Sequence, residues 1–137
     1  MGVPIFPPPL ETDLLRPFYA GLAVGELRLT ANARTGEWVW YPQEVIPGHP
    51  DDALQWRVVS PEGSIYAFTR VERSLLPGEH KAETPFTVVL FESDDAPGAR
   101  VLGLFVAAEG VEPACGMRAR LHPVRAGEIM VAGFAPV

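Results

Sequence analysis

The segment Thr30–Pro50, "TANARTGEWVWYPQEVIPGHP", has the layout of a metal-binding knuckle pair. It contains two short turns, Asn32 to Thr35 and Ile46 to His49, joined by an aromatic hairpin with Trp38, Trp40 and Tyr41. It contains no cysteine, and zinc in a structural site needs about four thiolate or imidazole ligands. The segment therefore predicts a zinc-ribbon frame whose geometry persists without zinc, held by the packing of its large rings.

Composition limits what the rest of the chain can be. The length of 137 residues suits one domain with a small appendage. The formal net charge of −6 and the single lysine, Lys81, argue against nonspecific nucleic-acid binding, which depends on clustered positive charge. The sequence shows no stretch suited to a membrane span and no secretory signal, so we expect a cytoplasmic protein with no membrane contact. The single cysteine, Cys115, fits a reducing compartment.

Fifteen prolines and thirteen glycines predict many short elements broken by turns, and so a mainly β fold. Residues 1–26 read as a proline-rich arm followed by one short helix, from Arg16 to about Val24, with a preceding turn begun by Thr12. Residues 27–56 read as the degenerate zinc-ribbon-like hairpin.

Residues 57–137 are predicted to form a five-stranded OB-type barrel whose first strand starts near Arg57. In "GSIYAFTRV" the residues alternate, with Ile65, Ala67, Thr69 and Val71 on one face and Tyr66, Phe68 and Arg70 on the other. Core filling is the preferred explanation of Tyr66 and Phe68. The apolar runs "PFTVVLFES" and "RVLGLFVAA" suit strands that are buried on both faces, "MRARLHPV" places Met117, Ala119 and Leu121 inward, and "EIMVAGF" closes the set.

Six pieces in this order carry a resemblance: "PFYAGLAVGELRL", the knuckles around "GEWVWYP", Trp56, "GSIYAFTRVERS", "PFTVVLFE" and "GMRARLHPV". Together they resemble the acyl-CoA-associated family known as domain of unknown function thirty-five, over almost the whole chain. The resemblance implies a helical hairpin, a rubredoxin-like zinc ribbon and an OB-fold. The family's paired ligands would fall on Asn32 and Thr35 and on Ile46 and His49, so this chain departs from the pattern and no zinc is expected.

The resemblance also implies a function. Members of the family are accessory subunits of thiolase-superfamily enzymes, including acyltransferases and retro-aldolases of steroid side-chain thioesters, and they help to bring acyl-CoA to the partner. The expected role is a non-catalytic subunit, two copies per partner dimer, with coenzyme A thioester as a shared ligand. Aromatic residues that are candidates for the partner interface lie on the helix and the hairpin: Phe18, Tyr19, Trp38, Trp40 and Tyr41.

One basic stretch is a candidate handle for CoA phosphates. "TRVERSLLPGEHKAETP" groups Arg70, Arg73, His80 and Lys81. The alternative is a solvated loop whose positive charges are balanced by Glu72, Glu79 and Glu83.

No complete catalytic site is apparent. Cys115 has no histidine partner in the sequence pattern, His49, His80 and His122 lack metal-ligand spacing, and the pairs Asp51–Asp52 and Asp94–Asp95 lie in turn sequences. Two alternatives stay open: a stand-alone nucleic-acid-binding OB domain, and a self-sufficient thioesterase that uses Cys115 or a carboxylate.

Overall fold

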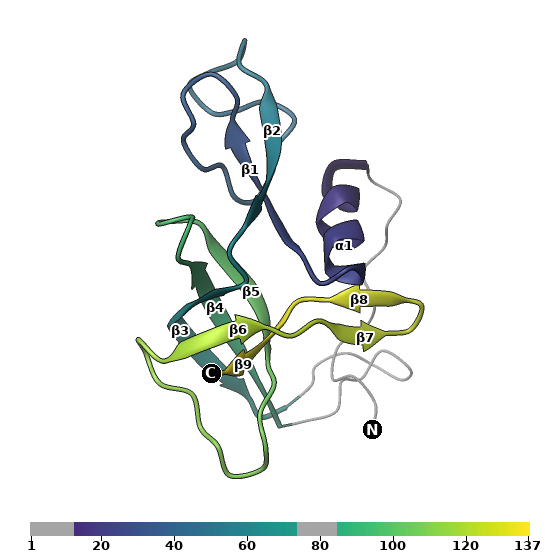
Figure 1. Ribbon diagram of the computed structural model, residues 1–137, viewed down its shortest axis with the longest axis vertical. Helices are drawn as coiled ribbons and strands as arrows, with labels where there is room; N and C mark the ends of the chain where they lie inside the picture. The colour runs from purple at the N-terminus through teal and green to yellow at the C-terminus, as the bar shows by residue number, and fades with distance from the viewer. Residues whose placement is uncertain (1–12, 74–84) are drawn as a thin grey trace.

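The structure, a computed structural model, describes residues 13–73 and 85–137. A barrel lies at one end, a two-stranded ribbon projects from it, and a helix lies beside the ribbon above a small hairpin (Figure 1). The elements in chain order are η1 Asp13–Leu15, α1 Arg16–Ala23, β1 Leu27–Asn32, β2 Leu54–Val59, β3 Glu62–Val71, β4 Phe86–Ser93, β5 Arg100–Phe105, β6 Arg118–Leu121, β7 Val124–Ala126, β8 Ile129–Val131 and β9 Gly133–Pro136.

The closed barrel has the strand order β3-β4-β5-β9-β6. All neighbours in it are antiparallel except β5 and β9, which run parallel. A mixed, closed, five-stranded barrel confirms the prediction of a mainly β chain with an OB-type fold.

Two details of the predicted barrel are wrong. Its first strand begins at Glu62, because Arg57 belongs to β2, which pairs antiparallel with β1 in the ribbon. Its last strand is β9, because the residues just before it form β8, which turns back on β7 across Gly127. Gly127 has a φ of 65°, a conformation that favours glycine. The hairpin therefore leaves only the end of "EIMVAGF" to close the barrel.

The barrel core centres on two stacked rings, Phe91 and Phe134, with centroids 4.1 Å apart. Gly103 leaves room for this stack, since a Cβ there would lie 2.5 Å from Phe134 Cε2. The predicted inward face of β6 is confirmed, because Ala119 and Leu121 are buried.

The burial of β3 follows the predicted alternation except at Thr69, which is exposed. The register with β4 shifts between Ile65 and Ala67, which marks a β-bulge or irregularity. Tyr66 is 52% exposed and Phe68 is 45% exposed, so the two aromatics do not fill the core as expected. Leu102 is also 52% exposed, which shows that β5 is not buried on both faces.

The helix confirms the prediction to within one residue. Pro17 occupies its first turn, and Phe18, Gly21 and Leu22 are its buried residues. It packs on β1 and β8, so it joins the ribbon to the small hairpin (Figure 1). Thr12 and the proline-rich arm lie outside the described residues. No helix in the described ranges has the length and apolar character that crossing a membrane would require.

Candidate docking and ligand-binding site

The first knuckle turn is organised by the side chain of Asn32, which is 1% exposed. Its Oδ1 accepts hydrogen bonds from the backbone N–H groups of Arg34 (2.8 Å) and Thr35 (3.2 Å). Its carbonyl oxygen accepts one from Gly36 N, 2.8 Å away, and Gly36 has a φ of 78°. An amide side chain that bonds its own following backbone is a stable turn without any metal.

The second knuckle turn is tied to the first by the carboxylate of Asp52. Asp52 Oδ2 accepts a hydrogen bond from Asn32 Nδ2 at 2.9 Å and lies 3.4 Å from His49 Nδ1. The Arg34 guanidinium grips the same carboxylate with two bonds, Nε to Oδ1 at 2.8 Å and Nη2 to Oδ2 at 2.9 Å. Residues at two of the four positions that correspond to zinc ligands, one from each turn, thus meet on one anionic oxygen.

This arrangement stabilises the ionised form of Asp52. The hydrogen bonds from Arg34 and then from Asn32 lower the pKa of Asp52 to about 2. The hydrogen-bond donors of Arg34 and Asn32 therefore surround a negatively charged group, the Asp52 carboxylate. In a zinc ribbon the group at the centre is instead a positively charged ion. Within the described ranges, no group of three or more His, Cys, Asp or Glu side chains is placed to hold a metal ion.

Local sequence patterns do not predict this polar junction. They indicate ring packing as the support of the two turns and a turn-forming role for Asp52, with nothing that connects it to Arg34. The two residues are separated by 18 positions, and only the pairing of β1 with β2 brings their ends together. The sequence signal for this contact is the presence of Arg34 in the first turn and of Asp52 shortly after the second turn.

We predict that the melting temperature is unaffected by removal of metal. Asn32, Thr35 and Ile46 supply no thiolate, and a structural zinc contributes its binding energy directly to folding only where its ligands exist. Thermal melts with and without a strong chelator, together with elemental analysis of the purified chain, check this. One tightly held zinc per chain would contradict it.

Four of the five predicted interface aromatics, joined by Trp56, line a seam between α1 and the ribbon: Phe18, Tyr19, Trp40 and Tyr41. The Trp40 ring lies 5.0 Å from Phe18, 4.7 Å from Tyr41 and 6.2 Å from Trp56, centroid to centroid. Tyr19 packs edge-on against Phe18, and burial, followed by the proximity of Tyr41, raises its pKa. Phe18 is only 5% exposed, so it serves the core of this chain.

Tyr41 differs from the other rings of the hairpin because it is 45% exposed. Its hydroxyl accepts a hydrogen bond from Leu102 N at 3.1 Å, so the ribbon loop is fastened to an edge of β5. Trp38 is half-buried beneath the Arg57 guanidinium, 5.9 Å from the ring centroid. Among the three hairpin rings, Tyr41 offers the most surface to a partner.

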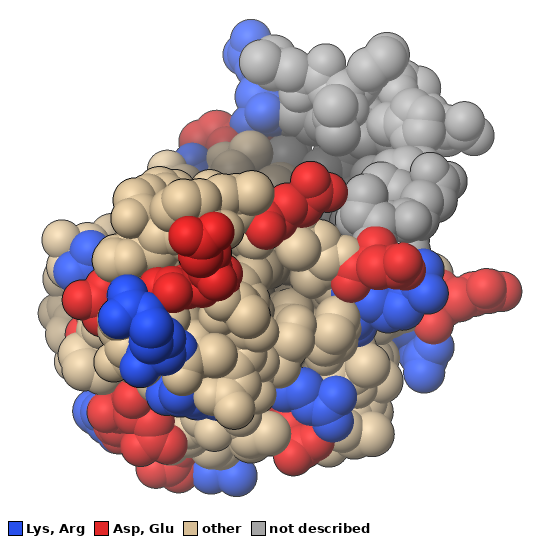
Figure 2. Space-filling model, turned by 90° about the horizontal axis from the view of Figure 1, so that it is seen from above, with Lys and Arg blue, Asp and Glu red and all other residues tan. Residues whose placement is uncertain are grey.

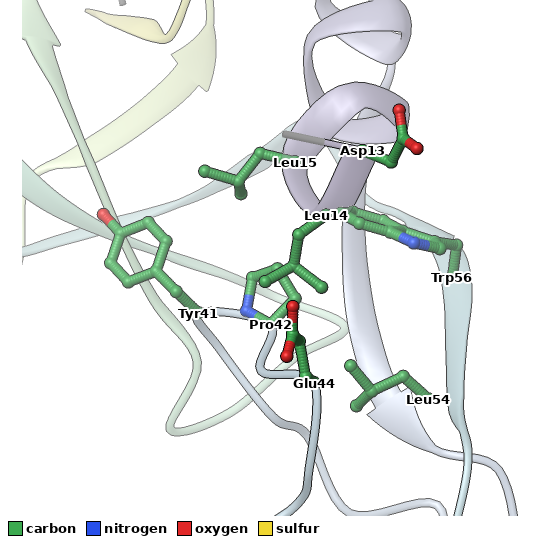
Figure 3. Close-up of a pocket in the computed structure, with 8 residues that line it drawn as sticks. All are labelled: Asp13, Leu14, Leu15, Tyr41, Pro42, Glu44, Leu54 and Trp56. Atoms are coloured by element: carbon green, nitrogen blue, oxygen red, sulfur yellow. The ribbon is translucent and has the colours of Figure 1, made fainter. Parts of the chain in front are cut away.

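A groove of about 630 Å³ opens beside this seam (Figure 3). Its walls come from the start of the helical segment, the loop after the aromatic hairpin, and β2. The lining residues are Asp13, Leu14, Leu15, Tyr41, Pro42, Glu44, Leu54 and Trp56. Leu54 and Trp56 lie on the same face of β2, because alternate residues of a strand point the same way. No local sequence pattern predicts this groove.

The structure describes the predicted basic cluster only in part. Arg70 Nε pairs with Glu72 Oε1 at 2.6 Å, as expected for a balanced surface, and Arg73 is exposed at the end of the described segment. His80 and Lys81 lie outside the described residues, so the grouping stays a prediction. On the face seen in Figure 2, acidic and basic side chains are interspersed, without a broad area of one sign.

Three of the four carboxylates considered for catalysis, Asp52, Asp94 and Asp95, have structural partners, and Asp51 is exposed. Arg118 grips Asp94 with two bonds of 2.8 and 2.7 Å, which lowers the pKa of Asp94. Asp95 accepts a hydrogen bond from Ser60 N at 2.7 Å, and Asp52 is held by Arg34. Cys115 is exposed in a turn before β6. These contacts give Asp52, Asp94 and Asp95 a structural role that needs no acid or base chemistry.

Searches for related proteins give a match only at the level of structure. No family model and no curated protein match the sequence. A solved chain described as "Ltp2-ChsH2(DUF35) aldolase" superposes with a TM-score of 0.76 at 18% identity, over 94% of this chain and 98% of that one. A DUF35 protein of unknown function from Sulfolobus solfataricus superposes with a TM-score of 0.57 at 9% identity, over 91% of this chain and 86% of that one. The helix, ribbon and barrel of this chain therefore have the fold of DUF35 proteins.

Proposed function

We propose that this chain is a DUF35-type accessory subunit that docks on a thiolase-superfamily enzyme and helps to bind its acyl-CoA substrate. The observation that carries the proposal is the likeness to the DUF35-labelled aldolase chain, which extends over nearly the full length of both chains. The likeness includes the ribbon and helix as well as the barrel, so it exceeds what a common small barrel alone would give.

The described part of the chain supports a binding role. The carboxylates of Asp52, Asp94 and Asp95 are engaged in ion pairs or backbone contacts, and the half-exposed ring of Tyr41 lines an apolar groove at the seam. Chemistry on the carbon–carbon bonds of an acyl-CoA thioester would then belong to the partner. Because thiolase-superfamily enzymes are commonly dimers, we expect two copies of this chain per partner dimer. In its most specific form, the proposal is that the partner is a retro-aldolase that acts on steroid side-chain thioesters.

The direct test is to recover the tagged chain from its native cell and identify what accompanies it. Co-purification of a thiolase-superfamily protein in equal amounts supports the proposal, and measurement of the mass of the complex gives the stoichiometry. Turnover of an acyl-CoA thioester by the isolated chain would instead favour the thioesterase alternative based on Cys115.

We predict that replacing both Arg73 and Lys81 by Ala weakens acyl-CoA binding to the assembled complex by about tenfold. A net charge of −6 repels CoA phosphates, so binding needs local positive charge, and each side chain supplies charge-assisted bonds. Titration of the complex at low and high salt checks this, because the salt dependence should fall with the loss of charge. Equal affinities at both salts would mean that these residues are ordinary surface.

A nucleic-acid-binding role is the second candidate, and one observation favours it. Tyr66 and Phe68 are both about half exposed on β3, and Arg100 stacks on the Tyr66 ring with its guanidinium carbon 3.6 Å from the centroid. Exposed aromatics with arginine can stack single-stranded bases. The acidic net charge opposes this function, and a gel-shift assay with single-stranded DNA and RNA decides between the two.

A further inference from the structure

The groove beside the seam is lined by apolar residues and by two acidic residues. Its interior is apolar, formed by Leu14, Leu15, Pro42, Leu54 and Trp56, with Tyr41 at one side (Figure 3). The only charged side chains among its eight lining residues are carboxylates, those of Asp13 and Glu44. The lining thus combines space for an apolar group with negative charge beside it.

The two carboxylates differ in how far they are already engaged. Asp13 pairs with Arg16 at 2.9 Å, a contact between two exposed side chains that water weakens. Glu44 is exposed, and across residues 13–73 and 85–137 no hydrogen bond or ion pair of its carboxylate is found. Glu44 is therefore the group with the greatest capacity to receive a cation from a bound molecule.

This charge pattern separates the groove from any CoA site. Phosphates placed beside Asp13 and Glu44 would be repelled, whereas a lysine or arginine would be attracted. The apolar interior of the groove favours an apolar side chain, such as that of leucine or phenylalanine, because both surfaces are removed from water on binding. A peptide segment that carries both groups matches the lining.

We propose that the groove is the docking site for a segment of the thiolase-superfamily partner in which an apolar side chain stands next to a lysine or arginine. The apolar side chain enters between Leu14 and Leu54, and the basic side chain pairs with Glu44. This inference rests on the proposed function, since it takes its occupant from that partner.

The ribbon contributes directly to the groove. Leu54 and Trp56 come from the ribbon strand β2, and Glu44 comes from the loop that the ribbon carries. The Asn32, Arg34 and Asp52 junction sits at the same end of β2 as Leu54, because Asn32 is the register partner of Leu54. The contacts of the junction therefore help to hold Leu54, one of the residues that line the proposed docking site, in place.

The test uses two matched pairs of variants and the thiolase-superfamily protein that accompanies the chain from its native cell. Glu44→Lys reverses a charge in the groove, and Glu109→Lys makes the same change at an exposed turn after β5. Leu54→Asn places an amide in the groove, and Val58→Asn makes a similar change on the same face of β2, at a residue outside the lining. Unchanged melting temperatures show that each variant is folded, and calorimetry gives the affinity for the partner.

We expect Glu44→Lys to weaken partner binding by about tenfold in dilute salt and by less in concentrated salt, since screening reduces an exposed charge interaction. Leu54→Asn should weaken binding by about tenfold at both salts, because its effect is desolvation of an amide. The Glu109 and Val58 variants should stay within about twofold of the wild type.

Partner binding with equal affinity to the wild type and to both groove variants would overturn the groove as a docking site while leaving the accessory role intact. Failure of any thiolase-superfamily protein to bind the wild-type chain would overturn the proposed function and the groove's occupant together. The two failures are therefore distinct.

Discussion

Replacing Asn32 by Ala should lower the free energy of unfolding by about 2 kcal/mol, through the loss of a buried capping side chain and its bond to a carboxylate. Asn32 is 1% exposed, and its amide satisfies the backbone N–H groups of Arg34 and Thr35 and donates to Asp52. Alanine retains none of these side-chain bonds. Denaturant unfolding of the purified chain measures the change.

Two control variants make the Asn32 result specific. Asp51→Ala removes an exposed carboxylate next to Asp52 and should change the free energy of unfolding by less than about 0.5 kcal/mol. Asn32→Asp keeps the acceptor for the two backbone groups but places a second anion against Asp52, so it should also destabilise the chain. An Asn32→Ala protein as stable as the wild type would show that ring packing alone holds the ribbon.

Local patterns predicted much of the fold. The spacing of Phe18 and Leu22 predicted the helix, and the alternation of Ala119 and Leu121 predicted the inner face of a barrel strand. Each of these inferences depends on residues that lie within one element or one turn of each other, where periodicity and turn chemistry are informative.

Features set by contacts between distant residues were missed. Tyr66 and Phe68 lie on the exposed face of β3, and their spacing alone does not tell which of the two faces of a strand is buried. The pairing of Arg57 with the ribbon instead of the barrel depends on β1, which lies 22 positions or more earlier along the chain than β2. The Arg34–Asp52 contact and the groove likewise depend on how the ribbon folds back on the helix.

The polar junction and the aromatic seam have different roles in the ribbon. The junction joins the two turns of the ribbon through Asp52, which contacts both Asn32 and His49. The seam joins the ribbon to α1 through the contacts of Trp40 with Phe18 and Trp56. The seam therefore holds the ribbon on α1 independently of the contacts between the two turns.

Among the rings of the hairpin, Tyr41 is where a change should most weaken the complex. It is 45% exposed and lines the groove, so a partner seated there would cover it. Large aromatic side chains that become desolvated at the centre of an interface dominate binding energy. We expect Tyr41→Ala to cost about 2 kcal/mol of association free energy with the thiolase-superfamily partner.

Tyr41→Phe separates this contact from the role of the residue within the chain. Phenylalanine keeps the ring and removes only the hydroxyl that accepts from Leu102 N, a neutral hydrogen bond worth about 1 kcal/mol. The Phe variant should therefore lose some stability but bind the partner nearly as well as the wild type, whereas the Ala variant should lose both. Calorimetric titration of the partner and thermal melts of each variant distinguish these outcomes. Unaltered binding after separate Ala substitutions of Trp38, Trp40 and Tyr41 would exclude the hairpin as the anchor, because no other part of it presents a comparable ring.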